Sequence, residues 1–194
     1  MVMRSERPAG GRRRLTAEDW ADAALAAMAE GGGLAAVAVE PLAARLGTTK
    51  GSFYWHFTGR DALVEAALAR WEETSTERII EATEARPDPE ERLRSLFLAV
   101  MTEAVNDPLE VSLLADAGQP HVAAVLRRVT ERRIGYVARL FEDLGFSAPT
   151  AAHRGLLAYT SYLGHTQLAH AVPGVLPPDR AYVDSVLETL LRRP

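Results

Sequence analysis

The chain has 194 residues, of which 47% are hydrophobic and 25% charged, and its formal net charge is −4 at pH 7. This balance is typical of a packed globular chain and argues against disorder beyond the first dozen residues. Without cysteine, disulfides, thiolate zinc sites and cysteine nucleophiles are excluded, and no apolar run approaches the ~20 residues of a membrane-spanning helix.

Charge is unevenly distributed along the chain. The first 60 residues hold more Lys and Arg than Asp and Glu, whereas the remainder is acidic. A basic end followed by an acidic remainder suggests two roles, one of which faces a polyanion. The basic N-terminus leads into no apolar stretch, so we expect no signal peptide, a cytoplasmic location and no membrane partner.

The first predicted elements are three short helices. Thr16 can cap a first helix, with Asp19 in the position of a capping box, and the glycines at 31–33 end it. A second helix is predicted over residues 39–46, followed by a tight turn at Gly47 and a third helix that starts at Thr48 or Thr49.

The rest of the chain repeats apolar residues at helical spacing, and strand-type alternation persists nowhere. Further helices are predicted at about 60–85, 89–104, 108–114, 120–141, 147–171 and 179–191. We therefore expect an all-α protein of about nine helices. Its predicted parts are a basic arm (1–14), a helix-turn-helix domain (15–60) and a helical domain for ligand binding and dimerisation (61–194).

Residues 48–57, TTKGSFYWHF, combine the only lysine of the chain with four aromatic residues. On a helix, Phe53 and Phe57 share one face and can pack with Leu42 and Leu46 of the preceding helix. The other faces then present polar groups that suit DNA. Lysine can donate to guanine or to phosphate, Gly51 lets the backbone approach a base edge, and serine, tyrosine and histidine can donate to bases or phosphates. The pattern indicates a helix-turn-helix whose second helix enters the major groove.

The segment LAARLGTTKGSFYWHFTGRDAL, residues 42–63, resembles the helix-turn-helix signature of TetR-type transcriptional regulators. The resemblance covers about residues 15–65. It implies that Lys50 and Gly51 approach base edges, that Ser52 contacts a base or phosphate, and that Thr49 caps the recognition helix. By the same resemblance, the expected DNA-backbone contacts come from Tyr54, Trp55, His56 and Arg60.

Two positions depart from the family pattern. Ala38 replaces the usual Ser or Thr cap of the second helix, and Glu40 places a carboxylate where a DNA contact is common. The run Arg12, Arg13 and Arg14 can compensate as an arm on the DNA, although a solvated tail is the alternative. For Trp55, a core position and a backbone contact are both open.

The resemblance also implies a homodimer through the last two long helices and a ligand pocket among the remaining ones. The predicted dimer interface, for which an ordinary core face within the chain is the alternative, comprises Leu157, Ser161, Gly164, Leu168, Val183, Leu187 and Leu190. The predicted pocket residues, for which ordinary core packing is the alternative, are Trp71, Phe97, Met101, Tyr136, Tyr159, Tyr162, His165 and Gln167.

These patterns predict a ligand-responsive regulator that binds a palindromic operator in double-stranded DNA and is most simply a repressor released by a small molecule. An activator is also compatible with the sequence. We find no catalytic residues, no cofactor motif and no metal-ligand spacing, His153, His165 and His170 included, so we do not expect an enzyme. A small helical enzyme or a protein-binding adaptor is the alternative.

Overall fold

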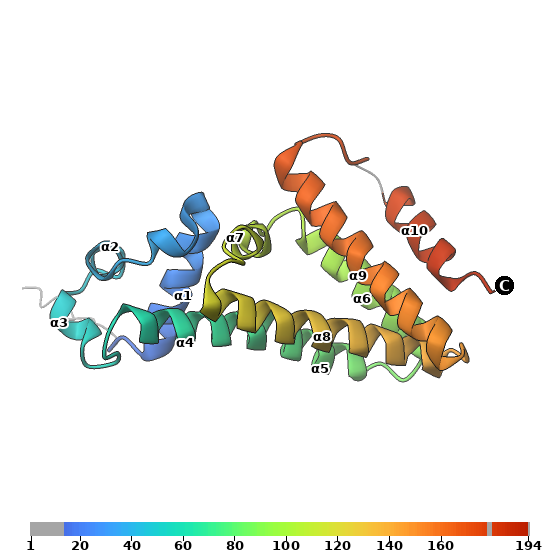
Figure 1. The fold of residues 1–194 in the computed structure, drawn as a ribbon, viewed down its shortest axis with the longest axis horizontal. Helices are drawn as coiled ribbons and strands as arrows, with labels where there is room; N and C mark the ends of the chain where they lie inside the picture. The colour runs from blue at the N-terminus through green and yellow to red at the C-terminus, as the bar shows by residue number, and fades with distance from the viewer. Residues whose placement is uncertain (1–13, 178–179, 194) are drawn as a thin grey trace, which may run out of the picture.

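The computed structural model describes residues 14–177 and 180–193, and within these ranges every regular element is helical and none is a strand. Figure 1 shows an elongated molecule with α3 at one end and α10 at the other. The described part of the chain contains ten α-helical segments, and two of them, α4 and α5, continue one another through a π-helical turn, which makes nine helices there. The all-α prediction is confirmed.

The N-terminal helices form where the sequence predicts them. Helix α1 (Ala17–Ala27) begins at Thr16, whose hydroxyl accepts the Asp19 N–H while the Asp19 carboxylate accepts the Thr16 N–H. A π turn (Met28–Gly32) and the 3₁₀ helix η2 (Gly33–Ala36) follow, and Gly31 has a φ of 96°, which suits glycine. Helices α2 (Val39–Arg45) and α3 (Lys50–Phe53) are separated by a turn at Gly47.

A long rod connects this end to the rest of the molecule. It consists of α4 (Arg60–Glu72), the π turn η3 (Glu73–Glu77) and α5 (Arg78–Glu84). The sequence predicts one helix over this range, and the π turn is the difference. Because π turns carry their hydrogen bonds five residues apart, this turn is wider than its neighbours and is a frequent feature of functional sites.

Five further helices complete the fold: α6 (Pro89–Glu103), α7 (Leu109–Ala115), α8 (Pro120–Asp143), α9 (Ala148–Ala171) and α10 (Ala181–Leu191). Helix α9 packs across α8 (Figure 1), and Gly155 of α9 lies at a close approach to the α8 backbone. A Cβ at Gly155 would lie 2.9 Å from the Ile134 carbonyl oxygen, so this crossing requires glycine. No helix in the described ranges combines the length and the apolar character that crossing a bilayer needs.

Two hydrophobic cores lie along the molecule. The first joins α1, α2 and α3 to α4, α7 and the first half of α8, and the second joins α5, α6, α9 and α10 to the second half of α8. The first core therefore extends across the boundary predicted at residue 60. Leu109, Leu113 and Val122 from the larger part pack into the same core as Phe53 and Phe57.

Candidate nucleic-acid interface and inner cavity

The recognition helix has one buried and one exposed face, as its sequence predicts. Phe53 is fully buried, and its ring contacts Trp20 at 5.4 Å and Phe57 at 5.4 Å between centroids. By contrast, Tyr54 is 57% exposed and Trp55 82% exposed. Trp55 is therefore no core residue, and both rings are available to a partner.

The polar residues around this helix lie on its open side. Lys50, Gly51 and Thr49 are exposed, whereas Ser52 and His56 are half-buried. Thr49 occupies the N-cap position with extended backbone, but its side chain makes no capping hydrogen bond. A Cβ at Gly51 would meet only the Thr49 hydroxyl, at an ordinary 3.6 Å, so packing within the chain does not require glycine there. A close approach by a partner would account for it.

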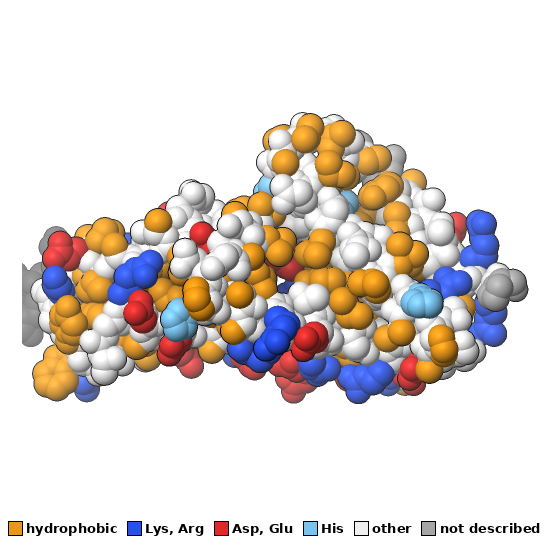
Figure 2. Space-filling model, viewed as in Figure 1, with side chains coloured by type: hydrophobic (Ala, Val, Ile, Leu, Met, Phe, Trp, Pro, Cys, Tyr) orange, Lys and Arg blue, Asp and Glu red, His pale blue; other side chains and the backbone are white. Residues whose placement is uncertain are grey.

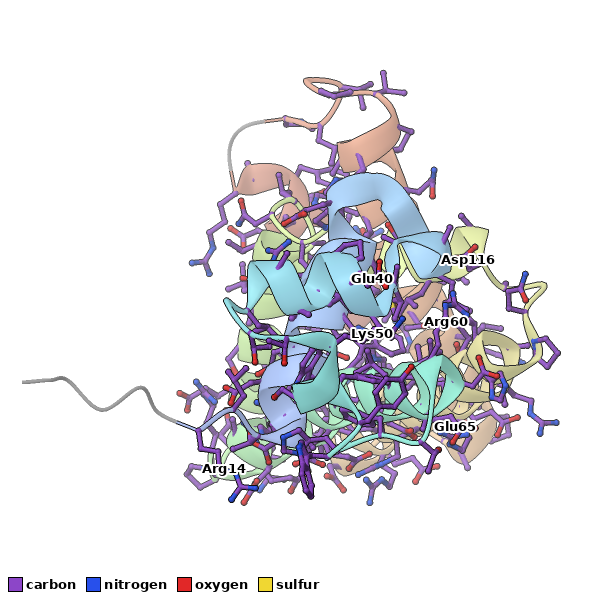
Figure 3. All side chains as sticks on the ribbon, turned by 90° about the vertical axis from the view of Figure 1, so that its left-hand side faces the viewer. Arg14, Glu40, Lys50, Arg60, Glu65 and Asp116 are labelled. Atoms are coloured by element: carbon purple, nitrogen blue, oxygen red, sulfur yellow. The ribbon has the colours of Figure 1, made fainter. Side chains whose placement is uncertain are left out.

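Lys50 forms an ion pair with Glu40 across the turn between α2 and α3. The Lys50 Nζ lies 3.0 Å from Glu40 Oε1, and Figure 3 shows the two residues side by side at this end of the molecule. The hydrogen bond to Glu40, together with its charge, raises the pKa of Lys50. In the free protein, the carboxylate thus offsets the charge of the predicted base-reading lysine.

Replacing Glu40 by Gln is expected to raise affinity for DNA of any sequence by roughly threefold to tenfold. The substitution removes a charge that repels phosphates and that competes with DNA for Lys50. Fluorescence anisotropy with labelled duplexes at several salt concentrations measures this effect. Weaker binding of the variant, confined to operators with one particular C·G pair, would instead mean that Glu40 accepts a hydrogen bond from cytosine.

Arg60 has a role inside the chain that the sequence does not reveal. Its Nε donates to the Val37 carbonyl at 2.7 Å and its Nη2 to the Leu34 carbonyl at 2.6 Å. The guanidinium therefore binds one carbonyl within η2 and one just after it, and its Nη1 lies 3.7 Å from Asp61. Only part of the group is left for the predicted phosphate contact, which stays a prediction.

The predicted basic arm is only partly described. Arg12 and Arg13 lie outside the described residues, whereas Arg14 is exposed just before α1. Figure 3 shows Arg14 at the edge of this end of the molecule, apart from Glu40 and Lys50. The predicted arm contact is therefore untested.

A cavity of about 350 Å³ lies inside the larger part of the molecule, among α4, η3, α5, α6, α7, α8 and α9. Five predicted pocket residues line it: Trp71, Phe97, Tyr136, Tyr159 and Tyr162. Burial, with the charge of Glu84 adding to it, raises the pKa of Tyr136 to about 12. The prediction from sequence did not include the aliphatic residues of α5 and α6 that also line the cavity, such as Ile79, Leu96 and Val100.

Three predicted pocket residues lie elsewhere. Met101 is buried in the second core, and Gln167 is exposed on α9. His165 stacks on Tyr182 of α10, with ring centroids 5.9 Å apart, and lines a separate cavity of about 230 Å³. Burial lowers the pKa of His165. Helical spacing shows which residues share a face of a helix, but it does not show whether that face lines the cavity, and these three residues lie on faces that do not.

A buried ion pair closes the inner end of the main cavity. Arg133 of α8 donates to Glu110 of α7 at 2.9 Å, and their side chains are 14% and 7% exposed. The Tyr162 hydroxyl donates to the same carboxylate at 2.6 Å. Burial is the largest influence and opposes the charge of Arg133, but the charge and hydrogen bond of Glu110 together with Tyr162 and Tyr159 outweigh it, so the pKa of Arg133 is raised. No sequence signal distinguished either residue from a solvated charge.

The predicted dimer residues divide between an open face and the core. On α9, Leu157 is 52% and Leu168 43% exposed, and Gly164 faces open space. Ser161 is half-buried on the same helix. Figure 2 shows hydrophobic side chains gathered over α9.

On α10 the prediction needs correction. Leu187 and Leu190 are buried in the second core of this chain, and Val183 packs against that core. Their apolar stripe faces α6 and α9, so the two leucines have no surface left for a partner.

Comparison with known proteins agrees with the helix-turn-helix geometry. Residues 21–67 match the family described as bacterial regulatory proteins, tetR family. No curated protein sequence matches the chain.

Solved structures match over almost the whole chain. A transcriptional regulator from Rhodococcus sp. Rha1 is 22% identical with a TM-score of 0.70, over 91% of this chain and 94% of that one. A TetR transcriptional regulator from Legionella pneumophila is 16% identical with a TM-score of 0.74, over 91% and 95%. SmeT, the repressor of the Stenotrophomonas maltophilia multidrug efflux pump SmeDEF, is 21% identical with a TM-score of 0.68, over 91% and 90%. The resemblance to TetR-type regulators is confirmed in the N-terminal sequence and in the fold.

Proposed function

We propose that this chain, with its tetR-family N-terminal segment and TetR-type fold, is a DNA-binding transcriptional regulator controlled by a small molecule. The observation that carries the proposal is the recognition helix. Its phenylalanine face is fixed in the core, while Lys50, Gly51 and Tyr54 are all exposed. A repressor that leaves its operator when the effector binds is the simplest form, as SmeT is described as a repressor.

A homodimer is the second part of the proposal. A two-fold dimer presents two recognition helices to half-sites about 34–36 Å apart, one turn of the duplex. Support comes from the open apolar face of α9, where Leu157 and Leu168 are exposed and Gly164 allows close helix contact. Exposed apolar patches of this kind mark protein interfaces.

Two helices join the cavity to the DNA-binding end. At one end of α7, Glu110 lines the cavity; at the other, the Asp116 carboxylate accepts the Leu34 N–H of η2 at 2.6 Å. Helix α4 begins with Arg60, which donates to the carbonyls of Leu34 in the same η2 and of Val37 just after it. A ligand that favours one arrangement of α4 and α7 would thereby shift the spacing of the recognition helices.

Replacing Lys50 by Ala is expected to weaken operator binding by roughly tenfold to a hundredfold and to relax base preference, because the lysine donates to a base edge. The measurement is fluorescence anisotropy with the DNA upstream of the gene and with a scrambled duplex. Arg78→Ala, which also removes an exposed positive charge but lies on α5, is the matched control. Unchanged affinity and preference in the Lys50 variant would remove Lys50 from the interface.

An experiment with the wild-type protein distinguishes the proposed function from the alternatives. An electrophoretic mobility shift with the upstream DNA, repeated across salt, should show binding that falls steeply with salt through counterion release. A helical enzyme or a protein-binding adaptor would give no such shift. Absence of any shift at low salt would reject the proposed function.

A further inference from the structure

We propose that the inner cavity binds apolar organic cations and discriminates against anions of the same size. This proposal rests on the ligand-responsive function proposed above, but binding itself is measured without DNA. Its basis is the chemistry of the cavity lining, taken from the inner end to the outer end.

The body of the cavity is apolar. Its volume of about 350 Å³ is at the lower end of the range for small-molecule sites. Aliphatic side chains of α5, α6 and α8, including Ile79, Leu96, Val100 and Val137, form its walls together with aromatic rings. A ligand therefore gains most of its affinity from apolar surface removed from water.

The cationic group at the inner end, Arg133, is already engaged within the chain. Each of its three guanidinium nitrogens donates to a neighbouring group. Its Nε donates to the Thr76 hydroxyl, its Nη1 to both oxygens of Glu110, and its Nη2 to the carbonyl and hydroxyl oxygens of Ser75. An anionic ligand would have to displace Glu110 and leave that carboxylate buried without its partner, which is strongly unfavourable.

The outer end is acidic. The lining contains three carboxylates, Glu103, Asp107 and Glu110, against the single guanidinium of Arg133, so its formal charge is −2. Because Glu110 and Arg133 compensate each other, the excess belongs to Glu103 and Asp107, which are both exposed. Glu103 is also the last residue of α6, where the helix dipole adds negative potential.

The aromatic rings also favour the outer end as the position of the ligand's positive charge. The Arg133 guanidinium already lies over Trp71 at 5.4 Å and over Tyr162 at 6.0 Å from the ring centroids. A second cation beside these rings would be repelled. The ligand's positive group therefore belongs near Glu103 and Asp107, with its apolar part directed inward past Phe97.

The test uses three probes with one apolar chain and different heads: decylammonium, decanol and decanoate. Isothermal titration calorimetry with the full chain is expected to show decylammonium binding at least about tenfold more tightly than decanoate. Val100→Phe, which fills part of the cavity, is expected to abolish binding of decylammonium; retained binding would place the probe elsewhere, for example on the open face of α9. Equal binding of cation and anion, tighter binding of decanoate or decanol, or no binding of decylammonium would overturn the proposal.

A separate variant tests whether Glu103 and Asp107 cause the preference for the cation. Glu103→Gln combined with Asp107→Asn is expected to bring the affinities for decylammonium and decanoate together, while decanol is unaffected. Glu131→Gln with Glu188→Gln removes the same charge from exposed positions on α8 and α10 and should leave the preference intact. If decylammonium binds as expected but the protein never binds DNA, the ligand class stands and the regulatory function fails.

Discussion

Replacing Glu110 by Ala is expected to lower the free energy of unfolding by about 3–5 kcal/mol, because it leaves the buried guanidinium of Arg133 without its counter-charge. The same change removes the acceptor of the Tyr162 hydroxyl. Urea unfolding followed by circular dichroism measures the effect, with equal slopes for both proteins as the check that their unfolded states are alike.

The double variant Glu110→Leu with Arg133→Met is the control for this prediction. It removes both charges together, and replacing a buried pair by apolar side chains of similar volume is often neutral. We expect it to recover most of the lost stability. If Glu110→Ala lowers the free energy of unfolding by less than about 1 kcal/mol, Arg133 and Glu110 do not form a buried ion pair in solution.

Replacing Phe53 by Ala is expected to cost about 3–5 kcal/mol, since the ring is fully buried against Trp20 and Phe57. Trp55→Ala, two positions along the chain, removes a larger ring that is 82% exposed. Its stability is expected to change by no more than about 0.5 kcal/mol, while DNA binding weakens. Thermal unfolding and anisotropy of both variants measure the pair of effects; equal destabilisation by the two changes would contradict the two-faced helix.

The helices and their ends were largely predictable because their signals are local. The Thr16 cap acts within one turn, and its side chain accepts the expected backbone N–H group; Asp88 caps α6 in the same local way. The recognition helix was predictable for the same reason, since two phenylalanines four residues apart define its buried face. The π turn of η3 was not, because no residue type in Glu73–Glu77 marks it.

The lining of the cavity could be predicted only in part. Helical spacing identifies the apolar stripe of a helix, but it does not identify the helix or the cavity that this stripe faces. Leu187 and Leu190 form an apolar stripe that fits an interface as well as the core in which they lie. Arg133 and Glu110 are ordinary charged residues of amphipathic helices until α7 and α8 bring them together, 23 residues apart in sequence. Arg60 likewise meets its carbonyl partners only through the tertiary fold.

The core that α1, α2 and α3 share with α7 and α8 limits how parts of such regulators can be exchanged. A chimera joined at residue 60 would keep Phe53, Phe57 and Trp20 but put foreign side chains in the same core at the positions of Leu109 and Val122. Grafting a new operator preference onto this scaffold therefore calls for changing only the solvent-facing residues of α2 and α3. A whole-segment transplant would need matching redesign of the helices beneath it.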